Sequence, residues 1–234
     1  MNIALIPARG GSKSIKKKNI AKLGEYPLIY YTIDIARKSE LINRTIVSTD
    51  DQEIKDVSLS FNAEVPFLRP KKIAGDHIND FEVIYHLIQW LKENEGIIPD
   101  SIIYLRPDFP FRNTKILNEA IEIYMKDNKA DGLRSVQQST EIPFKTWLLK
   151  DGYLKSVVDY NNIKDPQNAA RQLFPQTYWP VGYIDIYDSK LVLGEETLRG
   201  KRMIPYIIEE EAINIGSFNE LDLAKLKIVD FVFD

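Results

Sequence analysis

The chain opens on residues 2–19, which read NIALIPARGGSKSIKKKN and decide its fold. The apolar run at 2–6 predicts a short buried strand. The segment 8–19 holds two glycines and five cations, which predicts a loop. Glycine lets backbone N–H groups approach phosphate oxygens, and Arg and Lys supply positive charge. The stretch therefore predicts a phosphate-binding loop at the carboxyl end of the first strand of an α/β sheet.

The alternation of strand and helix patterns continues outward from this loop. Strands are predicted at 45–48, 64–68 and 101–105, and helices at 27–38, 51–59, after Asp76 and around 116–124. Asp50 and Glu53 have the spacing of a helix cap and capping box for the helix at 51–59. Such βα units are typical of a mostly parallel sheet covered by helices.

The second half of the chain is less regular. Between 132 and 187 it reads as short strands with polar interruptions, including a hairpin at 147–157 around Asp151-Gly152 and a strand at 182–186. Strands at 203–208 and 212–215 and a helix from about Glu220 follow. We expect one α/β domain over residues 1–234, a three-layer Rossmann-like sheet, with an inserted β-rich segment at about 140–190.

Composition excludes several classes of protein. The 234 residues include 31 Lys plus Arg and 34 Asp plus Glu, a formal charge of -3, which is too balanced for a protein that coats nucleic acid or membrane. With no Cys and two His, the chain has no thiolate nucleophile and no Cys-ligated zinc site. The absence of cysteine suits a cytoplasmic protein, and the first apolar run is too short for a signal peptide. We therefore expect a cytoplasmic protein without a membrane span.

The first loop matches neither of the common phosphate-binding motifs, the Walker A motif and the dinucleotide fingerprint. Considered alone, its composition favours a phosphate site, with a solvated basic loop as the alternative. However, the run IPARGGSKSIKKKNI closely resembles the N-terminal signature of the acylneuraminate (CMP-sialic acid) cytidylyltransferases. Segments similar to further motifs of that family follow in order, at 26–33, 46–51, 68–76, 143–145 and 171–175.

The resemblance implies a Mg²⁺-dependent nucleotidyltransferase that joins CTP to an acidic sugar of the sialic-acid type, giving CMP-sugar and pyrophosphate. It also implies a homodimer formed through the inserted segment. The implied nucleotide-binding residues are Ala8, Arg9, Gly10, Gly11, Ser12, Lys13, Lys18, Asn19, Arg69 and Arg106. Those implied for the acidic sugar are Lys145, Arg171 and Gln172. Arg9, Lys18 and Asp108 are the implied catalytic residues.

The chain departs from the family pattern at three motifs. One is the family's NG before its late strand, which appears here as Val181-Gly182. Where the family has LQPTSPLR, this chain has LRPDFPFR at 105–112, so Arg106 replaces Gln and Asp108 replaces Thr. The family's C-terminal Asp-x-Asp, which carries magnesium, aligns with Asn214-Ile215-Gly216. Mg²⁺ prefers oxygen ligands. By its position Asp108 resembles the metal-binding Asp of the related CMP-Kdo synthetases, and in the wider superfamily such an Asp is paired with an Asn late in the chain. This resemblance implies that the metal site has moved to Asp108 and Asn214. The alternative is a degenerate homologue that binds a nucleotide without catalysis.

Arg106 also bears on specificity. An extra fixed cation near the nucleotide or sugar would favour an acceptor with a second anionic group, or a different base. Transfer from another NTP, or to a phosphorylated acceptor, therefore stays open as an alternative. Asp50 and Asp76 are candidates for a general base by their location, but both are also expected at helix starts.

Overall fold

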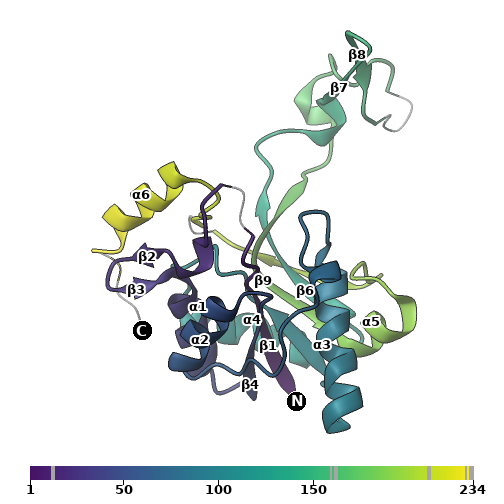
Figure 1. Ribbon diagram of the computed structural model, residues 1–234. Helices are drawn as coiled ribbons and strands as arrows, with labels where there is room; N and C mark the ends of the chain where they lie inside the picture. The colour runs from purple at the N-terminus through teal and green to yellow at the C-terminus, as the bar shows by residue number, and fades with distance from the viewer. Residues whose placement is uncertain (12–13, 159, 161–162, 210–211, 230, 232–234) are drawn as a thin grey trace.

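A six-stranded sheet forms the centre of the computed structural model, which describes residues 1–11, 14–158, 160, 163–209, 212–229 and 231 (Figure 1). The strand order is β10-β6-β9-β5-β1-β4. Strand β9 runs antiparallel to β5 and β6, whereas the other pairs are parallel. The strands are β1 (Asn2–Pro7), β4 (Arg44–Ser48), β5 (Ser101–Tyr104), β6 (Gly132–Gln138), β9 (Tyr178–Asp188) and β10 (Met203–Ile207).

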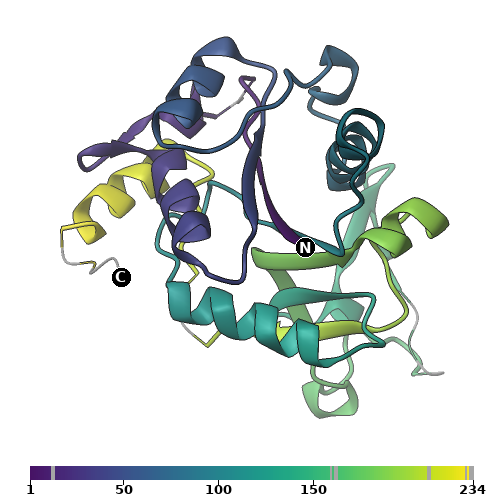
Figure 2. The same ribbon diagram turned by 90° about the horizontal axis from the view of Figure 1, so that it is seen from below.

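Helices cover both faces of this sheet (Figure 2). One face carries α1 (Leu28–Lys38), α2 (Gln52–Ser60) and α4 (Thr114–Lys126), and the other carries α3 (Asp80–Glu95) and α5 (Ser189–Glu195). Strand β1 shows why both faces need a cover: Ala4 and Ile6 pack in one apolar core, whereas Ile3 and Leu5 pack in the other. The predicted three-layer α/β fold is confirmed.

The remaining elements are short or peripheral. A third core packs α6 (Phe218–Lys227) against the start of α1. Short strands and 3-10 helices complete the description: β2 (Lys22–Leu23), β3 (Tyr26–Pro27), η1 (Lys18–Ile20), η2 (Lys71–Ile73), η3 (Pro143–Lys145) and η4 (Arg171–Leu173). Among the described residues, no helix is long and apolar enough to cross a membrane.

Two predicted strands are wrong. The segment 64–68 makes a single bridge to β4, at Glu64, because Pro66 lacks the N–H that a continued ladder would need. The segment 212–215 forms no ladder either. Instead, the Ile215 N–H donates to the carbonyl of Asp108 at 2.8 Å, which ties this segment to the loop after β5.

The predicted cap of α2 is wrong by one residue. Asp51, not Asp50, accepts a hydrogen bond from the N–H of Ile54, at 3.1 Å. Asp50 instead accepts from the N–H of Gly10 at 2.9 Å, so it holds the first loop. Helix α6 also begins earlier than predicted: Ser217 is its cap, and Glu220 is the reciprocal partner in its capping box.

A segment between β6 and β9 leaves the sheet at 139 and returns at 177. Its hairpin pairs β7 (Trp147–Lys150) with β8 (Tyr153–Ser156) and projects away from the sheet (Figure 1). Asp151 and Gly152 have φ values of 55° and 80°, which confirms the predicted hairpin turn. Strand β6 and residues 178–188 belong to the central sheet rather than to the projecting segment.

Candidate functional site

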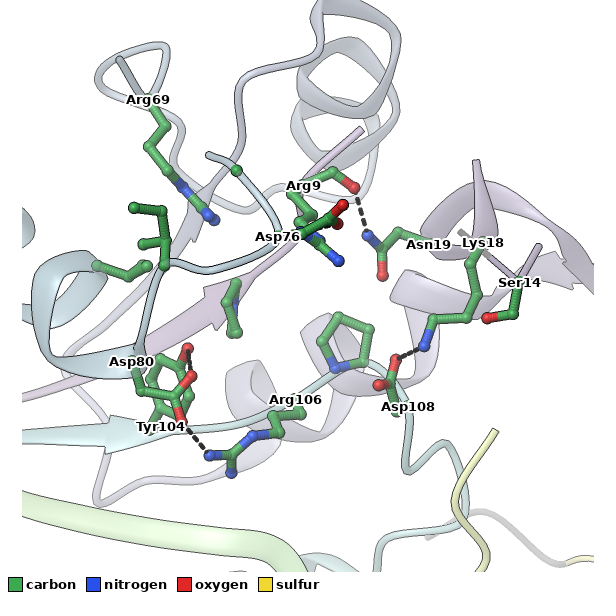
Figure 3. A pocket seen from close by; sticks show the side chains of 15 residues that line it. Arg9, Ser14, Lys18, Asn19, Arg69, Asp76, Asp80, Tyr104, Arg106 and Asp108 are labelled. Carbon is green, nitrogen blue, oxygen red and sulfur yellow. Dashed lines mark hydrogen bonds and ion pairs between the residues drawn. The ribbon is translucent and has the colours of Figure 1, made fainter. Parts of the chain in front are cut away.

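A pocket of about 350 Å³ opens at the carboxyl edge of the parallel strands, where ligands bind in open α/β sheets. Figure 3 shows two groups of side chains in it: the loop after β1 with Asp108, and Asp80 with Tyr104 and Arg106. The lining residues are Pro7, Arg9, Ser14, Lys18, Asn19, Arg69, Gly75, Asp76, Ile78, Asp80, Val83, Tyr104, Arg106, Pro107 and Asp108.

Backbone hydrogen bonds fix the start of the first loop. The N–H of Ala8 donates to the carbonyl of Ser48 at 2.9 Å, and the N–H of Gly10 donates to Asp50. A Cβ placed on Gly10 would lie 2.8 Å from the Cβ of Asp51, so this position requires glycine. The N–H groups of Ala8 and Gly10 therefore hold the loop against the end of β4 in this structure.

Two cations of the loop face the pocket, and each has a carboxylate partner. Arg9 Nη1 lies 2.7 Å from Asp76 Oδ1, and Lys18 Nζ lies 2.8 Å from Asp108 Oδ1. Lys18 Nζ also donates to the carbonyl of Ile215 at 3.0 Å. Buried Asn19 donates to the carbonyl of Arg9 at 3.0 Å, which sets the curvature of the loop. The structure therefore brings Arg9, Lys18, Asn19 and Asp108 together at one pocket, and their predicted roles in binding and catalysis stay predictions.

The side chains of Lys16 and Lys17 do not line this pocket. Lys17, which has a φ of 52°, pairs with Glu53 on α2. Lys16 is exposed and lines a separate pocket beside α6. The predicted nucleotide-binding residues Ser12 and Lys13 lie outside the described residues, and Gly11 is exposed. Of the described loop cations, Arg9 and Lys18 are those that can reach a ligand in this pocket.

Arg69 forms another wall of the pocket. It is 5% exposed, its Nε donates to Ser48 Oγ at 3.0 Å, and its Nη2 donates to the carbonyl of Ser48. Burial lowers the pKa of the Arg69 guanidinium, but a group with an ordinary value of 12.5 stays charged. Arg69 therefore brings a fixed positive charge to the pocket, and its predicted role in nucleotide binding stays a prediction.

Arg106 lines the pocket but is neutralised by two carboxylates. Its Nη2 lies 2.6 Å from Asp80 Oδ2, and its Nη1 lies 2.8 Å from Asp185 Oδ2. Tyr104 donates to the other oxygen of Asp80 at 2.8 Å, and burial together with Asp80 raises its pKa well above 10. The expectation that Arg106 supplies an extra positive charge for a second anionic group is therefore wrong.

The predicted metal ligands lie on neighbouring segments. Asp108 lines the pocket, and the hydrogen bond from Ile215 holds the segment that contains Asn214 beside it. The side chain of Asn214 is exposed and does not line the pocket. In the part of the chain that the structure describes, no three acidic or His side chains gather as a metal cage. A cation here would use one or two protein oxygens together with phosphate oxygens, which is common for Mg²⁺.

The residues predicted for the acidic sugar lie on the projecting segment. Lys145 Nζ donates to the carbonyl of Ala169 at 2.7 Å, and Arg171 Nη2 donates to the carbonyl of Thr140 at 3.2 Å. Arg171 and Gln172 share a small pocket of about 250 Å³. None of these three lines the pocket beside the first loop, so within one subunit the two predicted halves of the site are separate.

Sequence reasoning missed Asp80, Tyr104 and Asp185. Asp80 follows the helix cap Asn79, and Tyr104 is the last residue of a strand, so each has an ordinary local explanation. A signal was nevertheless present for Asp185: a carboxylate within the apolar strand β9 is 0% exposed and needs a cationic partner. Arg106 is that partner.

Comparisons with known proteins identify the family of the chain. A family model described as cytidylyltransferase matches residues 3–179. A pseudaminic acid cytidylyltransferase of Campylobacter jejuni is 36% identical over 96% of this chain and 95% of its own length. An N-acylneuraminate cytidylyltransferase of Escherichia coli is 30% identical over 95% of this chain, which spans about half (51%) of the length of that relative.

Solved structures share the fold at low sequence identity. A CMP:2-keto-3-deoxy-manno-octonic acid synthetase complexed with CTP has a TM-score of 0.72 at 13% identity, over 99% of both chains. A 4-diphosphocytidyl-2C-methyl-D-erythritol synthase has a TM-score of 0.67 at 15% identity, over 97% of both chains. The fold, the loop after β1 and the family match agree, and the chain belongs to the acylneuraminate cytidylyltransferase family of nucleotidyltransferases.

Proposed function

We propose that this protein joins CTP to a nonulosonic acid, an acidic sugar of the sialic-acid type, to give CMP-sugar and pyrophosphate. The observation that carries the proposal is the pair Arg9 and Lys18, which face one pocket in a chain of the cytidylyltransferase family. Relatives named for N-acylneuraminate and pseudaminic acid support the class of acceptor. The predicted cytoplasmic location stays a prediction.

The triphosphate of CTP binds to Arg9 and Lys18 in this proposal. Its oxygens compete with Asp76 and Asp108 for the two cations, because a triphosphate carries more negative charge than a carboxylate. Arg69 adds a third fixed charge from the pocket wall. These contacts hold the nucleotide in position and stabilise charge on the leaving pyrophosphate.

The transfer itself is a substitution at the α-phosphorus. The anomeric oxygen of the sugar forms a bond to that atom, the bond from the α-phosphorus to the oxygen that bridges to the β-phosphorus breaks, and the hydroxyl proton passes to solvent water. Pyrophosphate leaves with the bonding electrons. Positioning and charge stabilisation, rather than a covalent enzyme intermediate, supply the catalysis.

Mg²⁺ belongs to the proposal as a cofactor. The donor set fits it, since Asp108 presents a carboxylate to the pocket next to the proposed phosphate site. The amide oxygen of Asn214, which is exposed on the adjoining segment and does not line the pocket, would be the second protein donor. When bound, the metal would neutralise negative charge on the phosphates. If Asp108 held the metal, Lys18 would still have the carbonyl of Ile215 as a hydrogen-bond partner.

The acceptor half of the site comes from the projecting segment of a second subunit in this proposal. Lys145, Arg171 and Gln172 do not line the nucleotide pocket of their own chain. An isolated two-stranded hairpin is marginally stable in water. The exposed apolar side chains of β7 and β8 give it a surface to bury in a homodimer, and they include Trp147, Leu149, Tyr153 and Leu154.

Pyrophosphate release tests the proposed activity. Each of CTP, UTP, ATP and GTP is combined with N-acetylneuraminic, pseudaminic and legionaminic acids and with a sugar 1-phosphate, in the presence of Mg²⁺. We expect release with CTP and at least one of the acids. Release only with the sugar phosphate, or tight CTP binding without any release, would replace this proposal by one of its alternatives.

Substitution of the two carboxylates that pair with loop cations tests the metal site. Asp108→Asn and Asp76→Asn each remove the partner of one loop cation, so they perturb the apo pocket similarly. We expect Asp108→Asn to lower Mg²⁺-dependent turnover about 100-fold or more, and Asp76→Asn about 10-fold or less. Near-normal turnover by Asp108→Asn contradicts the metal assignment.

Sedimentation tests the homodimer. Leu149→Asp places a charge on the hairpin at a side chain that is 76% exposed, so the fold of the single chain tolerates it. Leu59→Asp on α2 is the matched control, because Leu59 is 45% exposed and lies outside the projecting segment. We expect a dimer for the native chain and the control and a monomer for Leu149→Asp; a monomeric native chain at micromolar concentration refutes the dimer.

A further inference from the structure

Arg106 joins the nucleotide pocket to the base of the projecting segment. Asp80, at the start of α3, holds one side of its guanidinium at 2.6 Å, and Asp185, in β9, holds the other side at 2.8 Å. The guanidinium also lies over the ring of Tyr104, 4.8 Å from the ring centre. The Arg106 side chain therefore contacts α3, β9 and β5 at once, and these contacts fix the three elements relative to one another.

The strands that carry the projecting segment are irregular beside Arg106. In the ladder of β6 and β9, Arg134 faces Asp185 but Val136 faces Pro180, so Ser135 alone lies opposite residues 181–184. We call 181–184 the bulge. Beyond the bulge, 136–139 and 177–180 pair again and lead into the projecting segment; we call these residues the stalk. A bulge bends its strand, so it sets the direction of the stalk.

Arg106 contacts the bulge directly. Its Nη1 donates to the carbonyl of Gly182 at 3.3 Å. Gly182 has a φ of +72°, and a Cβ there would lie 2.8 Å from the same Nη1. The guanidinium therefore occupies the space that a side chain at 182 would need. Arg112 holds the next residue, since its Nε donates to the carbonyl of Tyr183 at 2.7 Å.

We propose that Arg106 is a positioning residue that fixes the bulge relative to the nucleotide pocket and thereby sets where the stalk carries the acceptor-binding side chains. The inference rests on the proposed function, because it assigns Lys145, Arg171 and Gln172 to the acceptor. The guanidinium does not itself bind the acceptor's carboxylate, since Asp80 and Asp185 already neutralise it. The positioning role also requires no contact between the Arg106 guanidinium and CTP.

Steady-state kinetics test the proposal first. Arg106→Gln removes the contacts to Asp80, Asp185 and the bulge. We expect the KM for the acceptor to rise about 10-fold or more, and the Kd for CTP, measured by calorimetry, to change less than about 3-fold. Arg134→Gln is the matched control: Arg134 lies 3.8 Å from the same Asp185 but is not among the side chains around Gly182, so both constants should stay within about 2-fold. An equal loss of CTP affinity in Arg106→Gln overturns the proposal and makes Arg106 a nucleotide-binding residue.

A second variant separates positioning from stability. Arg106→Gln leaves the fully buried carboxylate of Asp185 without its closest cation, which destabilises the fold. In Arg106→Gln/Asp185→Asn that charge is gone, so we expect the melting temperature to recover. The acceptor KM should stay raised, because the contact with the bulge is still missing. Recovery of the acceptor KM together with the melting temperature shows a merely structural role and overturns the proposal.

Hydrogen exchange gives a readout that does not need turnover. We expect the stalk amides to exchange about 10-fold or more faster in Arg106→Gln/Asp185→Asn than in Asp185→Asn alone, with unchanged exchange in β1. Unchanged exchange in the stalk overturns the positioning role even if the native enzyme is active. Conversely, a native enzyme that forms no CMP-sugar refutes the proposed function. Faster exchange of the stalk amides in Arg106→Gln/Asp185→Asn would then still support the proposal that Arg106 fixes the bulge.

Discussion

Lys18 offers a sharp test of the nucleotide pocket, because Lys16 in the same loop is a natural control. Lys18 is 14% exposed, and its ammonium lies 2.8 Å from Asp108 and 3.0 Å from the carbonyl of Ile215. Lys16 is exposed and does not line the pocket. Lys18→Gln and Lys16→Gln change the net charge equally, so a difference between them reports geometry rather than the total charge of the loop.

The magnitude follows from the contact that is lost. A hydrogen bond to a charged group contributes about 1.5–3 kcal/mol, which corresponds to about 10- to 150-fold in affinity. We therefore expect Lys18→Gln to weaken CTP binding by this factor. Lys16→Gln should change it less than about 3-fold, because an exposed charge is screened by salt.

Calorimetric titration of CTP at 0.15 M salt measures both variants. The loss of the pair with Asp108 should cost about 1 kcal/mol of folding stability, so the fold persists and Kd can be compared directly. Equal weakening by the two variants would refute the reasoning, since long-range attraction by the whole loop would then explain the binding. A loss below about 3-fold for Lys18→Gln would also refute it.

Three further predictions concern the fold around the site. Gly10→Ala brings a Cβ to 2.8 Å from Asp51, so we expect it to lower the free energy of unfolding in urea by about 1–3 kcal/mol. Gly11→Ala is the control, because a Cβ there meets nothing within 4 Å and should leave stability unchanged. Equal destabilisation by the two variants would contradict the account. Asp51→Ala removes the cap of α2 and should cost about 1 kcal/mol in the same assay, and no change would disprove the cap assignment. Burial and the nearby cations lower the pKa of His86 below 6.5, so the unfolded chain binds a proton at this residue more readily than the folded chain does. We therefore expect the free energy of unfolding to fall as the pH drops below about 6.5, and His86→Gln to reduce this fall. Equal acid sensitivity of the native protein and His86→Gln would contradict this prediction.

Local patterns predicted the parts of the fold that depend on neighbouring residues. The buried strand from the apolar run at 2–6 and the Asp151-Gly152 turn both depend on a few consecutive residues, and both predictions are confirmed. The segment 64–68 has the composition of a strand but pairs with β4 at Glu64 alone, because Pro66 lacks the N–H that the next bond of the ladder needs.

The candidate site shows where sequence reasoning ends. Arg9, Lys18 and Asp108 could be predicted to share a pocket, because the carboxyl ends of parallel strands meet at one edge of the sheet. The partners of Arg106 could not be predicted, since Asp80 and Asp185 lie 26 and 79 residues away in the chain. Whether Arg106 is a free cation depends on those two carboxylates, and in the structure they neutralise its charge.

The central claim is CMP transfer to a nonulosonic acid, and ³¹P NMR of the complete reaction tests it most directly. With CTP, Mg²⁺ and the accepted acid, the account predicts that the three CTP signals disappear while one phosphodiester signal and the pyrophosphate signal grow at an equal molar rate. Appearance of CDP and inorganic phosphate, or CTP signals that persist with every acid, would contradict it.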